Sequence, residues 1–284
     1  MNQNITVVEI RKQIKQSLAG LYDENEIRNY TDLMFQHLLN YSKIDIRLKG
    51  SEVISQHFIE KIEETLKRLR VFEPIQYILG ETVFFDLPLV VSPDILIPRP
   101  ETEELVDWII RENEGKEIRI LDIGTGSGCI AVALAKKLPL AKVTGVDVSK
   151  TALEIACKNA ALNNTDMEFF RFDVLKQTPV LKGEFDIIVS NPPYVRESEK
   201  KLMCPNVLQY EPHQALFVPD DDPLIFYKAI ADVGRKILVR EGVVYCEINE
   251  ALPDETMSVF QNRGYTSVEV RRDINNKPRM IKAG

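Results

Sequence analysis

The chain has 284 residues, a length that suits one large domain or two smaller ones with a sizeable core. Apolar residues make up 44% of it and charged residues 28%, as in ordinary water-soluble globular proteins. No apolar run is long enough to span a bilayer and the N-terminus does not resemble a signal peptide, so we expect a cytoplasmic protein without a membrane partner. The net charge of −7, with no basic excess in either half, disfavours direct binding to nucleic acid.

The four cysteines are not spaced as a metal site or a disulfide framework, so we expect no metal. Cys129, Cys157 and Cys246 lie in apolar segments, which predicts that they are small buried side chains. Cys204 lies in a predicted loop. No serine or cysteine nucleophile motif accompanies the three histidines.

The first 80 residues are predicted to be helical. Apolar side chains recur at helical spacing over residues 7–18, 23–42 and 51–70, and Ser51 is a candidate N-cap of the third segment. We therefore predict a small helical bundle as a separate domain, residues 1–80. Its composition alone fits either a docking module or a cap.

Residues 81–98 are predicted to form a β-hairpin and a linker. The segment "TVFFDLPLVV", residues 82–91, has the pattern of two short strands with a turn near residues 86–88. A proline-stiffened loop follows and enters a helix near residues 100–103, where proline and acidic residues suit a helix start.

From residue 117 onward the pattern alternates between strand and helix. The predicted strands are residues 117–123, 142–148, 167–173, 185–191 and 242–248, followed by a closing antiparallel pair at 265–273 and 279–283. The predicted helices are residues 129–138, 151–163, 223–238 and 252–264. This order predicts a Rossmann-like α/β domain, residues 99–284, with a mostly parallel sheet and an antiparallel C-terminal hairpin. Such sheets bind ligands at the C-terminal ends of their strands.

The segment "ILDIGTGSGCI" joins the first of these strands to the first helix through a glycine loop. It does not fit the dinucleotide pattern G-x-G-x-x-G, because the position of the third glycine is Cys129. The pattern D-x-G-x-G-x-G instead resembles the first motif of class I methyltransferases, which bind S-adenosyl-L-methionine and release S-adenosyl-L-homocysteine. The resemblance implies that Asp122 orients the methionine end of the cofactor. It implies that the loop surrounding the cofactor is Gly124, Thr125, Gly126, Ser127 and Gly128.

Two more acidic residues end the next two strands. Asp147 can accept hydrogen bonds from both ribose hydroxyls, although it would do so equally for NAD. Asp173 lies where methyltransferases place the adenine amine, and Phe172 and Val174 are expected to wall the ring. Three acids at strand ends, in register with the glycine loop, favour a cofactor site over three unrelated turn caps.

The segment "IVSNPPYV" ends the fourth strand with Asn191, Pro192, Pro193 and Tyr194. It resembles the NPPY motif of amino-group methyltransferases. The Asn191 side-chain oxygen and the Pro192 carbonyl can each accept one N–H of a planar NH2 group, and Tyr194 can pack on its flat face. The prolines make these acceptors rigid, and Asn191 is expected to border the cofactor as well. The motif leaves two substrates open, adenine in nucleic acid or glutamine in protein.

The segments "EPIQYILGE", "LIPRPETEELV", "LDIGTGSGCIAVALA", "VDVSKTALEIACKNA", "FDIIVSNPPYV", "EPHQALF" and "REGVVYCEI" follow in this order. Together they resemble the peptide chain release factor glutamine methyltransferases, the HemK/PrmC family. The resemblance implies a substrate, the glutamine of the Gly-Gly-Gln loop in class I release factors, and an N-terminal domain that helps to dock the factor. It also implies that residues 97–103 lie beside the pocket. For Arg99 and Glu101 an ion pair and a substrate contact both stay open, while Glu211 and Pro212 are expected at the pocket mouth.

The chain departs from the family pattern after Glu247, where members often have glycine. Here the sequence is "EINEAL", and Asn249 can adopt a glycine-like φ more easily than most residues, so we expect altered loop detail without loss of activity. Asn276 is expected near the glycine of a later loop. The alternatives are an adenine methyltransferase, a nicotinamide-dependent oxidoreductase and a binding protein with an inactive site. The motifs do not specify the oligomeric state or the preferred release factor, and we expect a monomer.

Overall fold

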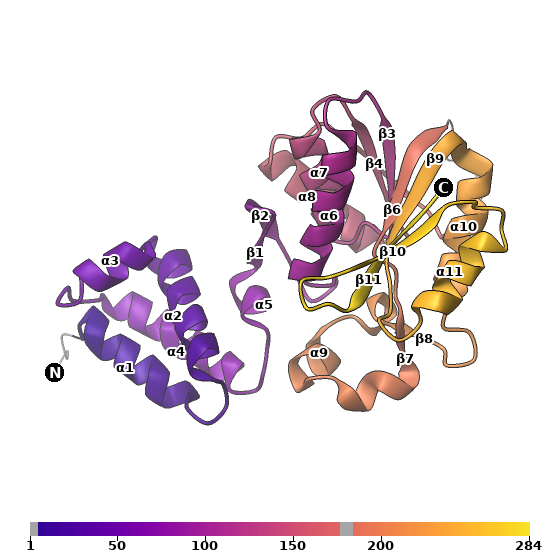
Figure 1. Cartoon of the computed structure of the whole chain (residues 1–284). Helices are drawn as coiled ribbons and strands as arrows, with labels where there is room; N and C mark the ends of the chain where they lie inside the picture. The colour runs from indigo at the N-terminus through magenta and orange to yellow at the C-terminus, as the bar shows by residue number, and fades with distance from the viewer. Residues whose placement is uncertain (1–4, 177–183) are drawn as a thin grey trace. The chain divides into compact units, whose positions relative to one another are not determined.

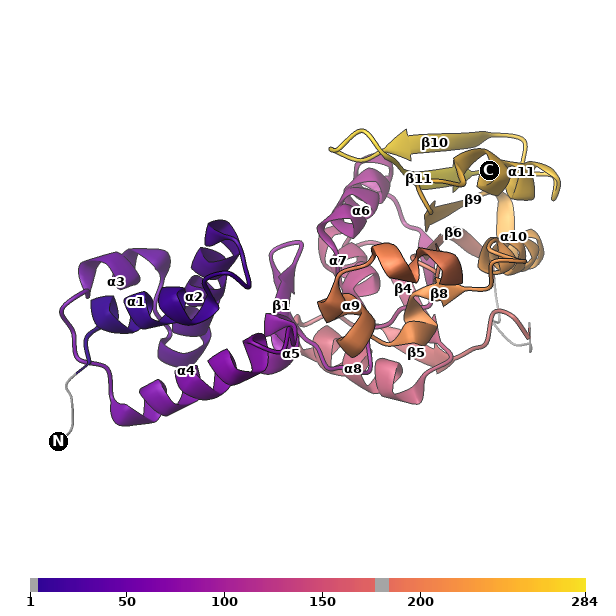
Figure 2. The same ribbon diagram turned by 90° about the horizontal axis from the view of Figure 1, so that it is seen from below.

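The computed structural model describes residues 5–176 and 184–284, and the chain divides into two compact units (Figures 1 and 2). The smaller unit contains Met1–Gly80 together with Pro205–Tyr210. The larger unit contains Glu81–Cys204 and Glu211–Gly284. The hairpin and linker expected at residues 81–98 are therefore part of the larger unit.

The smaller unit is a bundle of helices, as predicted. Its helices are α1 (Val7–Leu18), α2 (Glu24–Leu39), α3 (Lys43–Leu48), α4 (Gln56–Leu69), α5 (Ile75–Leu79) and α9 (Pro205–Tyr210). The apolar stripes of α1, α2 and α4 meet in one core. Capping boxes begin three of the helices, with Thr6, Asp23 and Ser42 as N-caps.

The prediction that Ser51 caps the third long helix was wrong. Helix α4 begins at Gln56, after Ser55. The backbone just before it is used elsewhere, because Glu52 O accepts from the start of α1 and Ile54 N donates to Ile5 O at 2.8 Å. An extended segment can make these bonds, whereas a helix starting at residue 51 could not.

The larger unit is built on a twisted sheet that is seven-stranded in the described residues, in the order β10-β11-β9-β6-β3-β4-β5. The strands are β3 (Arg119–Ile123), β4 (Lys142–Asp147), β5 (Glu168–Arg171), β6 (Phe185–Ser190), β9 (Leu238–Glu247), β10 (Val268–Arg272) and β11 (Pro278–Ala283). The pairs among β3, β4, β5, β6 and β9 are parallel, and β11 is antiparallel to both of its neighbours. The predicted fold class is confirmed.

Helices cover both faces of this sheet (Figure 1). The helices are α6 (Pro100–Asn113), α7 (Cys129–Lys137), α8 (Lys150–Leu162), α10 (Ile225–Ile237) and α11 (Pro253–Gln261). Alternate residues of each strand point to opposite faces, so Ile187 and Val189 of β6 pack in the core under α6 and α7, and Ile188 packs under α10 and α11. This burial on both faces explains why the strands read as continuous apolar runs.

The chain leaves the parallel strands at one edge of the sheet. The last residues of β3, β4, β5, β6 and β9 are Ile123, Asp147, Arg171, Ser190 and Glu247. Because β3 lies between β4 and β6, the order reverses at β3 and the loops there diverge to leave a crevice.

The hairpin of β1 (Glu81–Phe84) and β2 (Leu87–Val90) is connected to the glycine loop by one asparagine. Its turn is at Phe85 and Asp86, whose φ angles of 51° and 62° give a two-residue turn slightly earlier than predicted. The buried Asn159 accepts from Val90 N at 2.7 Å and donates to Val90 O at 2.9 Å and to Ser127 O at 2.8 Å. The Asn159 side chain thus connects α8 to both the hairpin and the glycine loop by hydrogen bonds.

Several short elements were not predicted. They are the helices α3 and α9, the parallel pair β7 (Val195–Arg196) and β8 (Phe217–Val218), and the 3-10 turns η1 (Glu197–Leu202) and η2 (His213–Ala215). Of the three cysteines predicted to be buried, Cys246 is buried and Cys129 is half-buried, whereas the prediction for Cys157 was wrong, because it lies on the solvent-facing side of α8. Over residues 5–176 and 184–284, no helix combines the length and the apolarity that crossing a bilayer requires.

Candidate active site

A cavity of about 290 Å³ lies at the carboxyl ends of the central strands, within the larger unit. Its lining comes from the segments that follow β3, β4, β5 and β6, from the loop before α6 and from the region of η2. The cavity thus lies where the reversal of strand order predicts a ligand site.

The glycine loop, residues 124–128, forms one wall of the cavity. Gly124 N donates to Val146 O at 2.8 Å and Gly126 N donates to an Asp147 carboxylate oxygen at 2.9 Å, so the loop is held against β4. Gly124 and Gly126 have φ of 73° and 55°, a region that favours glycine. The space that a Cβ at Gly124 would occupy has no heavy atom within 4 Å, so a ligand can approach the backbone there. The loop residues that line the cavity are Gly124, Thr125, Gly126 and Ser127.

Asp147 lines the cavity at the end of β4, as predicted from its position. Its carboxylate accepts from Gly126 N and from Ser149 N, at 2.9 Å and 2.8 Å. Burial raises the pKa of this carboxyl, and the backbone N–H donors oppose that shift. Two oxygens fixed by backbone donors retain lone pairs that can accept hydroxyl groups.

Asp173 and Val174 line the cavity on the other side of Asp147. Lys176 forms an ion pair with Asp173 at 3.0 Å, and this contact lowers the pKa of the Asp173 carboxyl. Phe172 adds an aromatic side chain to the same wall. The expected set of carboxylate and apolar groups is therefore assembled here.

Asp122 and Gly128 do not line the cavity. Asp122 is 0% exposed behind the glycine loop, and its Oδ2 accepts from the Thr125 hydroxyl at 2.6 Å. Its Oδ1 has no hydrogen-bond partner within the described residues, although the N–H of Ala131 still favours its charged form. Burial raises the pKa of Asp122 to about 7. Gly128 instead approaches α8, where an added Cβ would lie 3.1 Å from the Ala156 Cβ.

The NPPY residues extend from the end of β6. Asn191, Pro192 and Pro193 line the cavity, but Tyr194 does not. The Tyr194 ring packs against the core under α10 and α11, and its hydroxyl donates to Glu247 Oε1 at 2.7 Å. The structure thus brings three of the four residues to the cavity and directs the phenol to a carboxylate behind it.

The loop before α6 is fixed by an ion pair. Glu211 is 4% exposed and accepts from Arg99 at 2.5 Å and from Ile97 N at 3.4 Å. Arg99 also lines the cavity, as does Pro212. An ion pair was one of the two roles left open for Arg99, and the structure contains it.

Comparison with known proteins agrees with this geometry. Two family models match the chain, the Methyltransferase small domain over residues 102–216 and the PrmC N-terminal domain over residues 9–80. A release factor glutamine methyltransferase of Flavobacterium psychrophilum is 47% identical, over 96% of this chain and 96% of that protein. One of Bacteroides thetaiotaomicron is 43% identical, over 96% of this chain and 98% of that protein. This chain belongs to the release factor glutamine methyltransferase family.

The solved structures support the fold of this methyltransferase. A crystal structure of a methyltransferase from Pyrococcus furiosus aligns with a TM-score of 0.50 at 19% identity. The alignment covers 81% of this chain and 98% of that one. At this identity the likeness is one of fold.

The cavity of this methyltransferase fits S-adenosylmethionine, its cofactor. Asp147 offers carboxylate oxygens suited to ribose hydroxyls, and the open backbone at Gly124 suits the methionine end. Phe172 and Val174 offer an apolar wall to the purine. In the described part of the chain Arg99 is the one cation of the lining, and its ion pair leaves no free charge for a phosphate.

Three polar residues that the sequence left without a role also belong to the site: Thr102 lines the cavity, as expected for residues 97–103, and Asn159 and Glu247 support it. Thr102 Oγ1 donates to Glu247 Oε2 at 2.7 Å and accepts from Asn191 Nδ2 at 3.1 Å. Glu247 ends β9 as Asp147 ends β4, so the rule of acidic residues at strand ends would have found it. The side chain of Asn249 also has an unpredicted role, because it donates to Tyr194 O at 2.9 Å. Asn249 does not adopt a positive φ, whereas Asn276 does, at 62°.

Proposed function

We propose that this enzyme methylates the side-chain amide nitrogen of the glutamine in the Gly-Gly-Gln loop of class I peptide chain release factors. The observation that carries the proposal is that Asn191 and Pro192 line the same cavity as Asp147 and the glycine loop. An acceptor pair for an NH2 group therefore borders the cofactor cavity. The names of the relatives from Flavobacterium psychrophilum and Bacteroides thetaiotaomicron support the substrate class.

The chemistry requires orientation more than a strong base. An amide nitrogen is a weak nucleophile because its lone pair is delocalised into the carbonyl. The Asn191 Oδ1 and the Pro192 carbonyl can each accept one N–H of the substrate, which holds the nitrogen in one orientation and stabilises the positive charge that develops on it. The cofactor supplies an electrophilic methyl group. The nitrogen gains that methyl group and releases one proton, which becomes far more acidic during the transfer.

We assign separate tasks to three segments of the chain. Residues 1–80 are the domain that docks the release factor, residues 81–98 are the hairpin and linker, and residues 99–284 carry out methyl transfer. We place the enzyme in the cytoplasm, because its proposed substrate is a translation factor, and the expectation of a monomer stays a prediction. Support for this division comes from the match of residues 9–80 to the PrmC N-terminal domain model.

The test is mass spectrometry of a bacterial class I release factor after incubation with the enzyme and S-adenosylmethionine. We expect the Gly-Gly-Gln peptide to gain one methylene group, and the gain to disappear when that glutamine is changed to alanine. An unmodified factor, with cofactor binding shown by calorimetry, would mean that the substrate is wrong. Methylation of adenine in DNA or RNA under the same conditions would identify the alternative.

A variant tests the role of the NPPY asparagine. Asn191→Ala removes one of the two N–H acceptors and is expected to lower the rate of transfer by about 100-fold or more. Cofactor affinity should change far less, because Asp147 and the glycine loop are intact. A variant that methylates the factor at the wild-type rate would refute the acceptor role of Asn191.

A further inference from the structure

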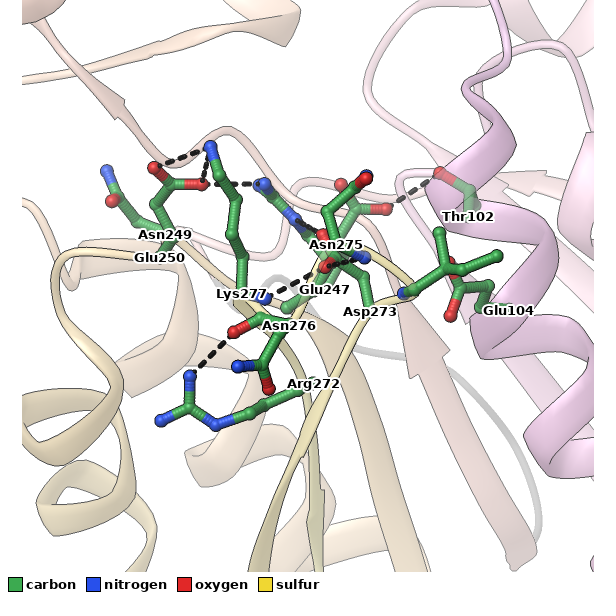
Figure 3. Close-up of polar contacts among 12 residues, drawn as sticks. Thr102, Glu104, Glu247, Asn249, Glu250, Arg272, Asp273, Asn275, Asn276 and Lys277 are labelled. Carbon is green, nitrogen blue, oxygen red and sulfur yellow. Dashed lines mark hydrogen bonds and ion pairs between the residues drawn. The ribbon is translucent and has the colours of Figure 1, made fainter.

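A chain of buried hydrogen bonds leads from the end of β9 to the NPPY asparagine. Glu247 is 1% exposed, and its two oxygens accept from two hydroxyls, those of Thr102 and Tyr194, each at 2.7 Å. Figure 3 shows the Thr102 contact reaching Glu247 from the first turn of α6. The Thr102 oxygen in turn accepts from Asn191 Nδ2 at 3.1 Å. Side chains from α6, β9 and the loop after β6 are thus connected.

The hydrogen bonds of this series can be donated in one direction only, from Asn191 to Thr102 and from Thr102 to Glu247. A threonine hydroxyl has a single hydrogen, and Thr102 gives it to a Glu247 carboxylate that, when ionised, can only accept. Toward Asn191 the Thr102 oxygen is therefore left as an acceptor, so the Asn191 NH2 group must face it. The Asn191 carbonyl oxygen then lies on the opposite side of the amide.

Both Glu247 oxygens receive a hydroxyl donor, so the geometry makes the side chain an acceptor. Burial raises the pKa of the Glu247 carboxyl, and the hydroxyls of Tyr194 and Thr102 and the positive charge of Arg279 oppose that shift. Arg279 is itself held by ion pairs to Glu250 at 2.9 Å and Asp273 at 3.4 Å. Figure 3 shows Glu250, just after β9, and Asp273, in the turn between β10 and β11, with the ion pair between Lys277 and Glu250.

We propose that Glu247 and Thr102 are positioning residues that fix the orientation of the Asn191 amide, so that its oxygen and not its NH2 group is presented to the substrate. An asparagine amide turned over has nearly the same shape, so packing alone does not choose between the two orientations. The wrong one would present N–H donors to the N–H groups of a substrate amide. The acceptor role of Asn191 in this inference rests on the proposed function. The direction of the hydrogen bonds rests on the contacts of Thr102 alone.

The first test compares three variants in methylation of a release factor. Thr102→Val removes the hydroxyl at nearly constant volume and is expected to lower kcat by about 10- to 100-fold. KM for the release factor and the Kd of S-adenosylmethionine should stay within about threefold of wild type, because valine keeps the volume of the Thr102 side chain at the cavity wall and Asp147 and the glycine loop are unchanged. Thr102→Ser should restore most of the rate. The matched control is Thr256→Val, another buried threonine of the same unit, whose hydroxyl donates to the backbone carbonyl of Leu252, the N-cap of α11, at 2.7 Å.

A double-mutant cycle tests the part of Glu247. Glu247→Gln introduces an NH2 group that can donate, so the direction of the chain is no longer fixed, and kcat should fall by at least about threefold. In the Thr102→Val background the same change should lower kcat no further. The proposed positioning role is wrong if Thr102→Val or Glu247→Gln keeps the wild-type kcat. It is also wrong if the fold-reductions in kcat of the two single variants multiply in the double variant.

A spectroscopic readout separates this inference from the proposed function. In protein labelled with 15N asparagine, the Asn191 NH2 protons should show nuclear Overhauser contacts to the Thr102 methyl group. The contacts should be absent in Asn191→Ala, which assigns them. They are expected whether or not a release factor is methylated, so a wrong substrate leaves this result unchanged. Their absence in the wild-type protein would overturn the inference directly.

Discussion

The buried Asp122 carboxyl should make the stability of the larger unit depend on pH, and Asp122→Asn should remove that dependence. Asp122 is 0% exposed and accepts one hydroxyl hydrogen bond, from Thr125, so its charged form is poorly solvated. Burial raises its pKa from 3.8 to about 7. An asparagine of the same shape cannot ionise.

The magnitude follows from the difference between the two pKa values. A carboxyl whose folded-state pKa is raised contributes stability that is fully present below 3.8 and is lost as the pH rises through about 7. At about 1.4 kcal/mol per pKa unit, the complete loss is about 4 kcal/mol, of which about 3 kcal/mol falls between pH 5 and pH 8. Burial also raises the pKa values of Asp147 and Glu247, so the stability of Asp122→Asn will still depend on pH. The contribution of Asp122 is therefore the difference between the pH dependence of wild type and that of the variant.

The assay is urea unfolding at several pH values between 5 and 8, followed by tryptophan fluorescence. Trp108 is the single tryptophan of the chain and is buried in α6, so the signal reports the larger unit. We expect the free energy of unfolding of wild type to fall by about 3 kcal/mol more than that of Asp122→Asn over this range. Parallel curves for the two proteins would refute the reasoning that burial holds this carboxyl protonated near neutral pH.

Three further substitutions test the frame of the site. Asn159→Ala leaves three backbone groups of the hairpin and glycine loop without a partner and should cost about 2–4 kcal/mol in urea unfolding; a loss below 1 kcal/mol would contradict this. Gly145→Ala places a Cβ 2.6 Å from the Phe169 ring, so we expect a cost of about 1–3 kcal/mol, and a neutral result would show that the ring yields. Arg99→Ala leaves Glu211 buried and unpaired, which should weaken cofactor binding in calorimetry several-fold, unlike an exposed control such as Arg111→Ala.

The fold was predictable because the central strands of this sheet, such as β3 and β6, are buried on both faces and the helices on one. Continuous apolar segments such as "FDIIVS" predict β6 directly, and their alternation with amphipathic segments predicts the parallel order. Short elements were missed for a physical reason. The six residues of α3 and the two-residue strands β7 and β8 form through tertiary contacts, since segments this short have little structural preference of their own.

The site was predictable where backbone position decides and not where side-chain direction decides. The positions of Asp147, Asp173 and Asn191 at strand ends place them at the cavity whatever their rotamers. Tyr194 comes three residues after Asn191, but its direction depends on Glu247, which is 53 residues away in sequence. No local pattern contains that information.

Acidic residues at equivalent strand ends have different chemistry because different groups cover them. Asp147 is open to the cavity at the end of β4, whereas Glu247 at the end of β9 is covered by the first turn of α6 and by Tyr194. A carboxylate open to a cavity can bind ligand hydroxyls, but a covered one can act only through the side chains that it contacts. Glu247 is connected to the site through Thr102, because the Thr102 hydroxyl donates to Glu247 and accepts from the Asn191 NH2 group. The element that packs over an acidic residue at a strand end therefore decides whether its carboxylate contacts a ligand directly or acts through neighbouring side chains.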